Sequence, residues 1–290
     1  MAAFLRPVRW AEALQMRAAH PDAVVLAGGT DLCVDINFGR LRPASLLDLT
    51  RVADLTAIER SNGSVRIGAG VTYQRLLDEL AADAPGLAAA ARTVGSPQIR
   101  NRGTIGGNLG TASPAGDCHP PLLAAGAHVE VASAAGSRLI PIAEFFVAPK
   151  RSALAPGELI AAVHIRRAAG PQVFAKVGTR NAMVIAVCSV ALTLDPVTRL
   201  IGTGLGSAGP VPLRAEAAEW FLAAALADRG LWDRPADLPA DVVSGFADLL
   251  AAAALPIDDV RGSAAYRRHA LRVLAGRALA WAWSDLWEME

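Results

Sequence analysis

The sequence predicts an α+β fold made of about three small units. Three observations lead to this prediction. Short segments with strand character occur at intervals up to residue 205, segments with helical spacing are interleaved with them and dominate from residue 214 onward, and turn residues separate the segments. With 290 residues, 53% of them hydrophobic and 19% charged, the chain can bury more than one core. We find no internal repeat.

The first unit is predicted over residues 1–55 and contains a strand, a helix and a strand in a small α/β arrangement. Residues 10–19 have the apolar spacing of a helix. Residues 24–27 form a short apolar strand, and residues 46–49 are expected to form the next strand.

The second unit is predicted over residues 56–170. Thr72 is placed to cap a helix over residues 73–82. A further helix is expected at residues 86–93, and strands at residues 64–69, 129–132, 139–142 and 159–165. About 30 residues after Gly95 are rich in Gly, Ser, Pro, Asn and Thr and show little regular pattern. A stretch of this length without regular structure is usually functional.

The third unit is predicted over residues 171–290, with a meander of strands followed by helices. The strands are expected at residues 173–177, 183–194 and 200–205, and the helices at residues 214–227, 240–254 and 264–285. The last helix places Leu271, Leu274, Ala278 and Ala282 on one face.

The charge and hydropathy of the chain exclude several classes of function. A formal net charge of +1 gives no reason to expect nucleic acid or an anionic membrane as partner, and the short basic pair Arg100 and Arg102 suits one phosphate better than a duplex. The mean hydropathy is +0.33, but the longest apolar stretch, residues 182–194, is shorter than the roughly 20 residues that span a bilayer. Charged residues interrupt the first 20 positions, so we expect no signal peptide and a cytoplasmic protein.

The three cysteines, Cys33, Cys118 and Cys188, are too few and too widely spaced for a disulfide framework or an iron–sulfur site. We expect them to be small buried apolar residues, and we predict no metal site and no catalytic residue in this chain.

A glycine loop follows the first predicted strand, in the sequence Ala27-Gly28-Gly29-Thr30-Asp31-Leu32. Two glycines allow the backbone to approach a ligand closely, and successive N–H groups can then hold an anion such as a phosphate. Asp31 is expected to cap backbone N–H groups, because a carboxylate aimed at a phosphate would be repelled. A simple turn is the alternative. The G-x-G-x-x-G spacing is absent, which argues against an ordinary dinucleotide site of the Rossmann type.

A second glycine loop, Thr104-Ile105-Gly106-Gly107-Asn108, repeats this chemistry about 75 residues later. Thr104 and Asn108 supply hydrogen-bonding side chains beside the paired glycines. Two such loops could hold one long ligand with a pyrophosphate in its middle. Asp117, further along the same stretch, could accept hydrogen bonds from a ribose, a ribityl chain or a ring N–H; its alternative role is that of a turn residue.

The chain resembles the FAD-binding medium subunits of molybdenum hydroxylases, such as those of carbon monoxide dehydrogenase and the split bacterial xanthine dehydrogenases. Their loops look like AGG-(T/H)-(D/S)-L and TIGGN, and both occur here. Residues 96–117 are similar to the second flavin loop of the family. Phe174-Ala175-Lys176 with Arg180 resembles the start of its C-terminal domain, and residues 262–267 resemble its closing segment.

The resemblance implies a PCMH-type FAD-binding domain of two α/β subdomains, residues 1–55 and 56–170, and a C-terminal α/β domain of the CO dehydrogenase flavoprotein type, residues 171–290. By this analogy the first loop would hold the pyrophosphate, the second loop and Asp117 the adenosine half and its neighbourhood, and Ile160 and Lys176 would approach the flavin ring. The implied FAD-binding residues are Val25, Leu26, Ala27, Gly28, Gly29, Thr30, Asp31, Leu32, Thr104, Gly106, Gly107, Asn108, Asp117, Ile160 and Lys176.

Two departures from the family bear on the flavin. Valine stands at position 94, where eukaryotic relatives have a phenylalanine near the ring. Neither glycine loop contains a histidine or cysteine for covalent attachment, so we expect non-covalent FAD.

The implied function is that of an electron-transfer subunit. Electrons would come from [2Fe–2S] clusters in a small partner subunit, and the molybdenum cofactor would lie in a large partner subunit, in an assembly that is expected to be a dimer of heterotrimers. FAD would pass the electrons to an external acceptor. The alternatives are a stand-alone FAD-dependent oxidase or reductase that acts directly on a small molecule, and a scaffold that has lost its flavin.

Overall fold

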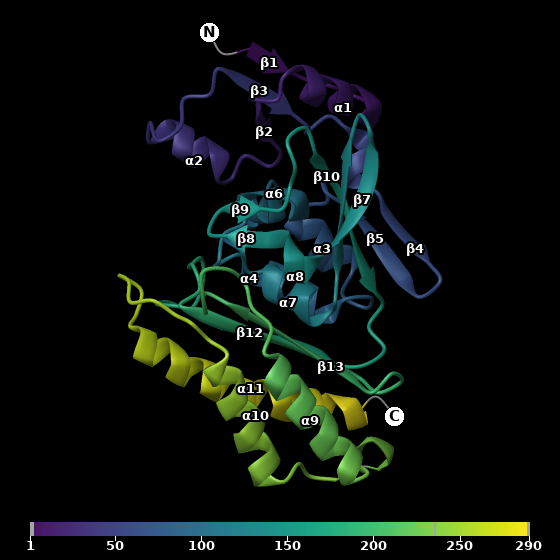
Figure 1. Ribbon diagram of the computed structural model, residues 1–290, viewed down its shortest axis with the longest axis vertical. Coiled ribbons are helices and arrows are strands. Elements are labelled where there is room, and N and C mark those ends of the chain that lie inside the picture. Colours follow the sequence, from purple (N-terminus) through teal and green to yellow (C-terminus); the bar gives the residue numbers. More distant parts are fainter. Residues whose placement is uncertain (1–2, 235, 289–290) are drawn as a thin grey trace.

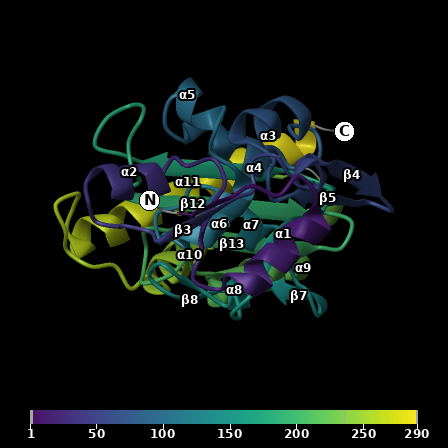
Figure 2. The same cartoon turned by 90° about the horizontal axis from the view of Figure 1, so that it is seen from above.

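The computed structural model describes residues 3–234 and 236–288, which form three units stacked along the long axis of the molecule (Figure 1). The view along that axis shows the units lying over one another, with the N-terminal unit nearest the viewer (Figure 2). One hydrophobic core runs through the first two units, and a second lies within the third. The predicted α+β class is confirmed, whereas the predicted boundaries at residues 55 and 170 remain predictions.

The N-terminal unit is a three-stranded parallel sheet in the order β1-β3-β2. Its elements are β1 (Ala3–Leu5), α1 (Trp10–Ala19), β2 (Val24–Leu26), α2 (Leu32–Asn37) and β3 (Ser45–Asp48). Helix α1 has the predicted bounds. Strand β1 was not predicted from the sequence, because three residues are too few to show a period.

The middle unit is a five-stranded antiparallel sheet in the order β4-β5-β10-β6-β7, flanked by short helices. Thr72 caps α3 as predicted, since its hydroxyl accepts a hydrogen bond from the backbone N–H of Arg75 at 3.4 Å. The elements are η1 (Ala53–Thr56), β4 (Ile58–Ser61), β5 (Ser64–Gly68), α3 (Tyr73–Glu79), α4 (Pro85–Thr93), β6 (His128–Ser133), β7 (Gly136–Pro141), α8 (Ile142–Phe145), β8 (Phe146–Ala148), β9 (Arg151–Ser152) and β10 (Leu159–Arg166).

The stretch after Gly95, expected to lack regular structure, contains three short helices: α5 (Pro97–Arg100), α6 (Ile105–Thr111) and α7 (His119–Ala124). Their glycines and prolines hide the helical period in the sequence. Ser96 and Thr104 accept hydrogen bonds from the first turns of α5 and α6. Pro97 is the first residue of α5, and Pro120 is the second residue of α7. Caps and tertiary packing therefore compensate for low helix propensity here.

The C-terminal unit is a three-stranded antiparallel sheet in the order β11-β12-β13, covered on one side by three helices (Figure 1). Its elements are β11 (Gln172–Val177), β12 (Cys188–Asp195), β13 (Leu200–Gly206), α9 (Glu216–Asp228), η2 (Leu231–Asp233), α10 (Ala240–Ala252) and α11 (Ala264–Glu288). The predicted strand over residues 183–194 is wrong in its first five residues. Cys188 pairs with Val177, the last residue of β11, so residues 183–187 have no strand beside them and form a loop.

Glycines on β13 allow α7 to pack directly on the C-terminal sheet. A Cβ atom at Gly202 would lie 2.0 Å from the carbonyl oxygen of Ala124, and one at Gly204 would lie 2.0 Å from that of Pro120. Both distances are far below van der Waals contact and involve backbone atoms, which cannot rotate away. The contact between the middle and C-terminal units therefore requires glycine at these positions.

This contact predicts that Gly204→Ala lowers the free energy of unfolding by roughly 2–3 kcal/mol, because α7 must move off the sheet. The matched control is Gly276→Ala in α11, where an added Cβ would meet its nearest atom, Cγ1 of Val243, at 3.6 Å. Urea unfolding followed by circular dichroism measures both variants. Equal stability of Gly204→Ala and the wild type would show that the two units are not held in this way.

Candidate functional site

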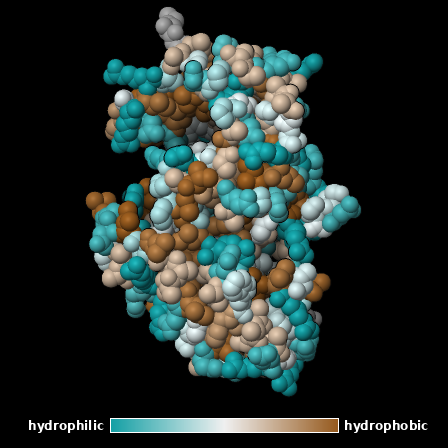
Figure 3. Space-filling model, in the orientation of Figure 1, coloured by the Kyte–Doolittle hydropathy of each residue, from teal (hydrophilic) through white to brown (hydrophobic). Residues whose placement is uncertain are grey.

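The two glycine loops lie against each other. A Cβ atom at Gly28 would lie 2.1 Å from the carbonyl oxygen of Arg102, just before the second loop, and one at Gly107 would lie 3.8 Å from Cβ of Ala27. The hydroxyl of Thr111 in α6 donates to the carboxylate of Asp31 at 3.2 Å. The surface of the molecule is hollowed between α2 and α6 (Figure 3). The structure thus brings together two loops that lie about 75 residues apart in the sequence.

The first loop joins β2 to α2 through a left-handed glycine. Gly29 has φ +78°, a conformation that side chains disfavour, and its carbonyl accepts from the backbone N–H of Cys33 at 3.0 Å. Val25 and Leu26 lie in β2, Leu32 begins α2, and Thr30 lies between these elements. Asp31 stands just before α2 but makes no capping hydrogen bond, so its expected capping role is wrong; its carboxylate is held by Thr111 instead.

The second loop is fixed by its own cap and by Ala69, the residue after β5. The hydroxyl of Thr104 accepts from the backbone N–H of Gly107 at 3.0 Å, and the N–H of Gly106 donates to the carbonyl of Ala69 at 2.9 Å. A Cβ at Gly106 would lie 2.6 Å from Cβ of Ala69. Gly106 is therefore required for packing. At Gly107, in contrast, the absent side chain leaves room beside the first loop.

Asp117 and Lys176 form a buried ion pair between the middle and C-terminal units. The ammonium group of Lys176 donates to one carboxylate oxygen, Oδ2, at 2.6 Å, and the two side chains are only 9% and 10% exposed. The hydroxyl of Thr93 donates to the same oxygen at 3.1 Å. Burial raises the pKa of Asp117, and Lys176 and Thr93 oppose that rise by stabilising the carboxylate.

The second oxygen of Asp117 is buried and has no hydrogen-bond partner among the described residues. The same is true of Oδ1 of Asn108 in the second glycine loop. Buried acceptors without partners are costly, so such atoms indicate groups that receive a hydrogen bond from a ligand. Two of the predicted binding residues thus have acceptor atoms available for the hydroxyls or N–H groups of a nucleotide.

Lys176 has no donor left for a ligand in this arrangement. Besides Asp117, its ammonium group donates to the carbonyl of Thr93 at 3.2 Å and to that of Val184 at 3.1 Å. An ammonium group has three N–H donors, and all three are used. Lys176 therefore joins α4, the segment before α7 and the loop after β11.

Ile160 is brought to the second loop by β10. Its side chain is 8% exposed, and its Cδ1 would lie 3.8 Å from a Cβ atom placed on Gly110 in α6. Ile160 thus supplies an apolar contact beside α6.

His119 is a fully buried, neutral residue beneath the second loop. One ring nitrogen, Nε2, lies 3.2 Å from the carbonyl oxygen of Asn108, and the ring centroid lies 4.5 Å from that of Phe146. Burial lowers the pKa of His119 to about 4. The adjacent Gly116 makes room for this ring, because a Cβ there would lie 2.3 Å from Cε1 of His119.

Several participants could not be predicted from the sequence. Thr93 and the carbonyl of Val184 show no motif, and only the fold brings them to Lys176. Arg100, considered a phosphate ligand, instead donates to the carbonyls of Val94 and Gly95 at 3.2 Å and so holds the end of α4. Cys33 was expected to be buried but is exposed, whereas Cys118 and Cys188 are buried as predicted.

Within residues 3–234 and 236–288, no three His, Cys, Asp or Glu residues are grouped so that they could hold a metal ion. No helix in the same part of the chain is both long and apolar enough to cross a membrane.

The burial of His119 predicts that acid destabilises the fold. In the unfolded chain His119 takes up a proton as the pH falls below its ordinary pKa of 6.5, but in the folded chain it does so only near pH 4. The free energy of unfolding therefore decreases as the pH falls from 6.5 to about 4. The contribution of His119 to this loss is about 2 kcal/mol between pH 7 and pH 5. His119→Phe removes the titration and keeps an aromatic ring against Phe146. Urea unfolding at both pH values should show a smaller loss in this variant than in the wild type; parallel losses would contradict the assignment.

Two protein-family models match the chain. Residues 1–167 match the FAD binding domain in molybdopterin dehydrogenase, and residues 174–282 match the CO dehydrogenase flavoprotein C-terminal domain. These matches confirm the implied fold and the implied cofactor, FAD.

Known proteins are similar over most of the chain. The glyceraldehyde dehydrogenase medium chain of Sulfolobus acidocaldarius is 30% identical over 281 residues, which cover 95% of this chain and 96% of that protein. The putative xanthine dehydrogenase FAD-binding subunit of Escherichia coli is 32% identical over 228 residues, with 75% and 78% covered. A chain of carbon monoxide dehydrogenase from Hydrogenophaga pseudoflava has the same fold, with a TM-score of 0.87 and 27% identity over 98% of both chains.

The paired glycine loops, the buried acceptors beside them and the match over the whole length agree with one another. The chain is an oxidoreductase subunit and belongs to the family of FAD-binding subunits of molybdopterin-dependent dehydrogenases.

Proposed function

We propose that this chain carries FAD as an electron-transfer subunit of a molybdenum hydroxylase, taking electrons from [2Fe–2S] clusters of a small partner subunit and passing them to an external acceptor. The observation that carries the proposal is the pair of buried, unpartnered acceptors, Oδ1 of Asn108 in the second glycine loop and Oδ1 of Asp117 further along the same stretch. Relatives named as a medium chain and as a subunit of a dehydrogenase complex support the multi-subunit setting.

In this arrangement the backbone of residues 25–32 holds the pyrophosphate of FAD. Thr104, Gly107, Asn108 and Asp117 bind the adenosine half and its neighbourhood, and Ile160 contributes an apolar contact to the flavin ring. Lys176 lies near the flavin ring and is paired with Asp117, whose carboxylate it stabilises and orients. FAD supplies the ability to take up one or two electrons, and the protein sets its position and environment.

The residues assigned here have positioning roles. Lys176 and Thr93 occupy Oδ2 of Asp117, which leaves Oδ1 to accept a hydrogen bond from the ligand. The molybdenum cofactor and the clusters belong to a large and a small partner subunit, in a dimer of heterotrimers. The cytoplasmic location and the role of Val94 near the ring remain predictions.

The first test is the mode of flavin attachment. The purified chain, incubated with FAD and desalted, is expected to show a flavin spectrum, and acid precipitation should release all the colour into the supernatant. Colour in the pellet would mean a covalent flavin and would favour a stand-alone oxidase. A folded chain that takes up no flavin, alone or co-expressed with its partner subunits, would contradict the proposal.

A second test uses the space at Gly107. Gly107→Val fills the room between the loops and pushes against Thr104, whose hydroxyl would lie 3.1 Å from the new Cβ. We expect FAD affinity to fall by roughly 100-fold, the equivalent of about two lost hydrogen bonds. Gly276→Ala is the control, because an added Cβ fits there. Fluorescence titration with FAD measures both; normal affinity in Gly107→Val would remove this loop from the site.

A further inference from the structure

His119 is a buried histidine whose hydrogen bond reaches the second glycine loop. Because burial lowers the pKa of His119 to about 4, the ring is neutral at pH 7 and carries a single N–H. One ring nitrogen, Nε2, lies 3.2 Å from the carbonyl oxygen of Asn108. A carbonyl oxygen can only accept, so the N–H is on Nε2. The ring therefore donates to the backbone of the residue whose side chain is assigned to FAD.

The carbonyl of Asn108 lacks the donor that a regular helix would give it. In an α-helix this carbonyl would accept from the N–H of Ala112, four residues later. Ala112 has the left-handed φ of +46° at the end of α6, and its N–H donates to the carbonyl of Leu109 at 3.0 Å instead. His119, the first residue of α7, supplies the missing donor. The hydrogen bond thus ties α6 to α7 at the level of Asn108.

The ring of His119 is held in place by close packing. Its centroid lies 4.5 Å from that of Phe146. On another side only glycine fits at position 116, because a Cβ atom there would lie 2.3 Å from Cε1 of the ring. The backbone N–H of His119 also donates to the carbonyl of Gly116 at 3.2 Å. The direction of the donor toward Asn108 is therefore fixed.

The second ring nitrogen shows that a histidine is costly for the fold at this position. Nδ1 is buried and has no hydrogen-bond partner among the described residues. The carbonyl of Ser113, which is close to the ring, can only accept. A buried acceptor without a donor destabilises a fold, and an apolar side chain of similar size would avoid that cost. The hydrogen bond to Asn108 explains the histidine where folding alone does not.

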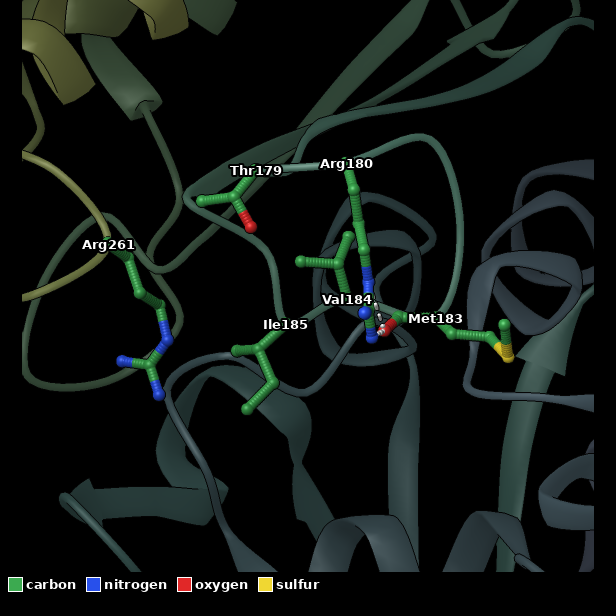
Figure 4. Close-up of a pocket in the computed structure, with 6 residues that line it drawn as sticks. All are labelled: Thr179, Arg180, Met183, Val184, Ile185 and Arg261. Atoms are coloured by element: carbon green, nitrogen blue, oxygen red, sulfur yellow. Dashed lines mark hydrogen bonds between the residues drawn. The ribbon is translucent and has the colours of Figure 1, made fainter.

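His119 is closed to solvent, unlike side chains elsewhere on the molecule. In the C-terminal unit a cavity of about 400 Å³ is lined by open side chains, among them Met183 and Ile185 (Figure 4). These two are 54% and 52% exposed, whereas His119 is 0% exposed and Asn108 is only half-buried. A ligand can therefore reach Asn108 but not the ring of His119. Any effect of His119 on a ligand passes through the groups that it holds.

We propose that His119 is a positioning residue for FAD. By donating to the carbonyl of Asn108, it fixes α6 so that Oδ1 of Asn108 faces the ligand. The inference rests on the proposed function and adds to it a residue that lies outside both glycine loops. His119 itself does not touch FAD.

The test compares the FAD affinity of variants at position 119, measured by fluorescence titration of the full chain. His119→Gln places an amide N–H close to the position of Nε2 and should bind FAD as the wild type does. The amide of His119→Asn is one carbon shorter and His119→Phe has no donor, so both should lose affinity roughly tenfold, the equivalent of about one hydrogen bond. Wild-type affinity in His119→Phe and His119→Asn, or an equal loss in His119→Gln, would overturn the proposal.

The matched control is His269→Phe, a replacement of an exposed histidine on α11. It should bind FAD with wild-type affinity. A tenfold loss in this variant as well would show that the effect is not specific to the hydrogen bond with Asn108.

A double-mutant cycle tests whether His119 acts through Asn108. Asn108→Ala removes Oδ1 and keeps the carbonyl that His119 binds. If His119 positions that oxygen, then adding His119→Phe to Asn108→Ala should lower FAD affinity no further. Losses that multiply in the double variant would mean that His119 supports the site in general, and they would contradict the proposal.

Failure of this inference differs from failure of the proposed function. If the wild-type chain takes up FAD and His119→Phe binds it equally well, only the role of His119 is wrong. If the wild type takes up no FAD, even with its partner subunits, the proposed function is wrong and the inference falls with it.

Discussion

The arrangement of the molecule depends on the buried ion pair between Lys176 and Asp117. The two charges lie almost out of solvent, and each is further satisfied by hydrogen bonds, to Thr93 and to the carbonyl of Val184. Removal of one partner from such a pair leaves an uncompensated buried charge, which costs about 3–5 kcal/mol. The pair therefore fixes three segments at once: the end of α4, the segment before α7 and the loop after β11. It also determines which oxygen of Asp117 is left for a ligand.

Close backbone contact at glycine is the second constraint. Gly204 allows α7 to lie on the C-terminal sheet, Gly28 allows the peptide after Arg102 to lie on the first loop, and Gly116 leaves room for the ring of His119. In each place, main-chain or ring atoms occupy the volume that a side chain would fill. The glycines at Gly28, Gly106 and Gly204 thus serve packing, whereas Gly107 borders the space between the loops. A paired-glycine motif can accordingly combine a structural and a binding position.

The sequence predicts most of the elements, because many have a clear period. Helix α1 appears at the predicted bounds, and the cap at Thr72 is present. The elements not predicted were too short, as in β1, or rich in glycine and proline, as in α6 and α7. The strand predicted from residue 183 fails because β-branched residues there have no neighbouring strand, a fact that only the register of β11 reveals.

The candidate site likewise has features that the sequence predicts and features that it does not. Paired glycines in two loops point to one ligand with a phosphate, and the fold does bring these loops together. Side-chain roles are less accessible to sequence reasoning, since they depend on partners far away in the chain. Asp31 pairs with Thr111 instead of capping α2, and Lys176 has all three donors occupied by protein groups.

The most direct test of the account is hydrogen–deuterium exchange of the full chain with and without FAD. The account predicts slower exchange of backbone amides on FAD addition in residues 27–32 and 104–117, with no change in α9 and α10. Protection confined to the C-terminal unit, or no protection in either glycine loop when FAD is bound, would contradict it.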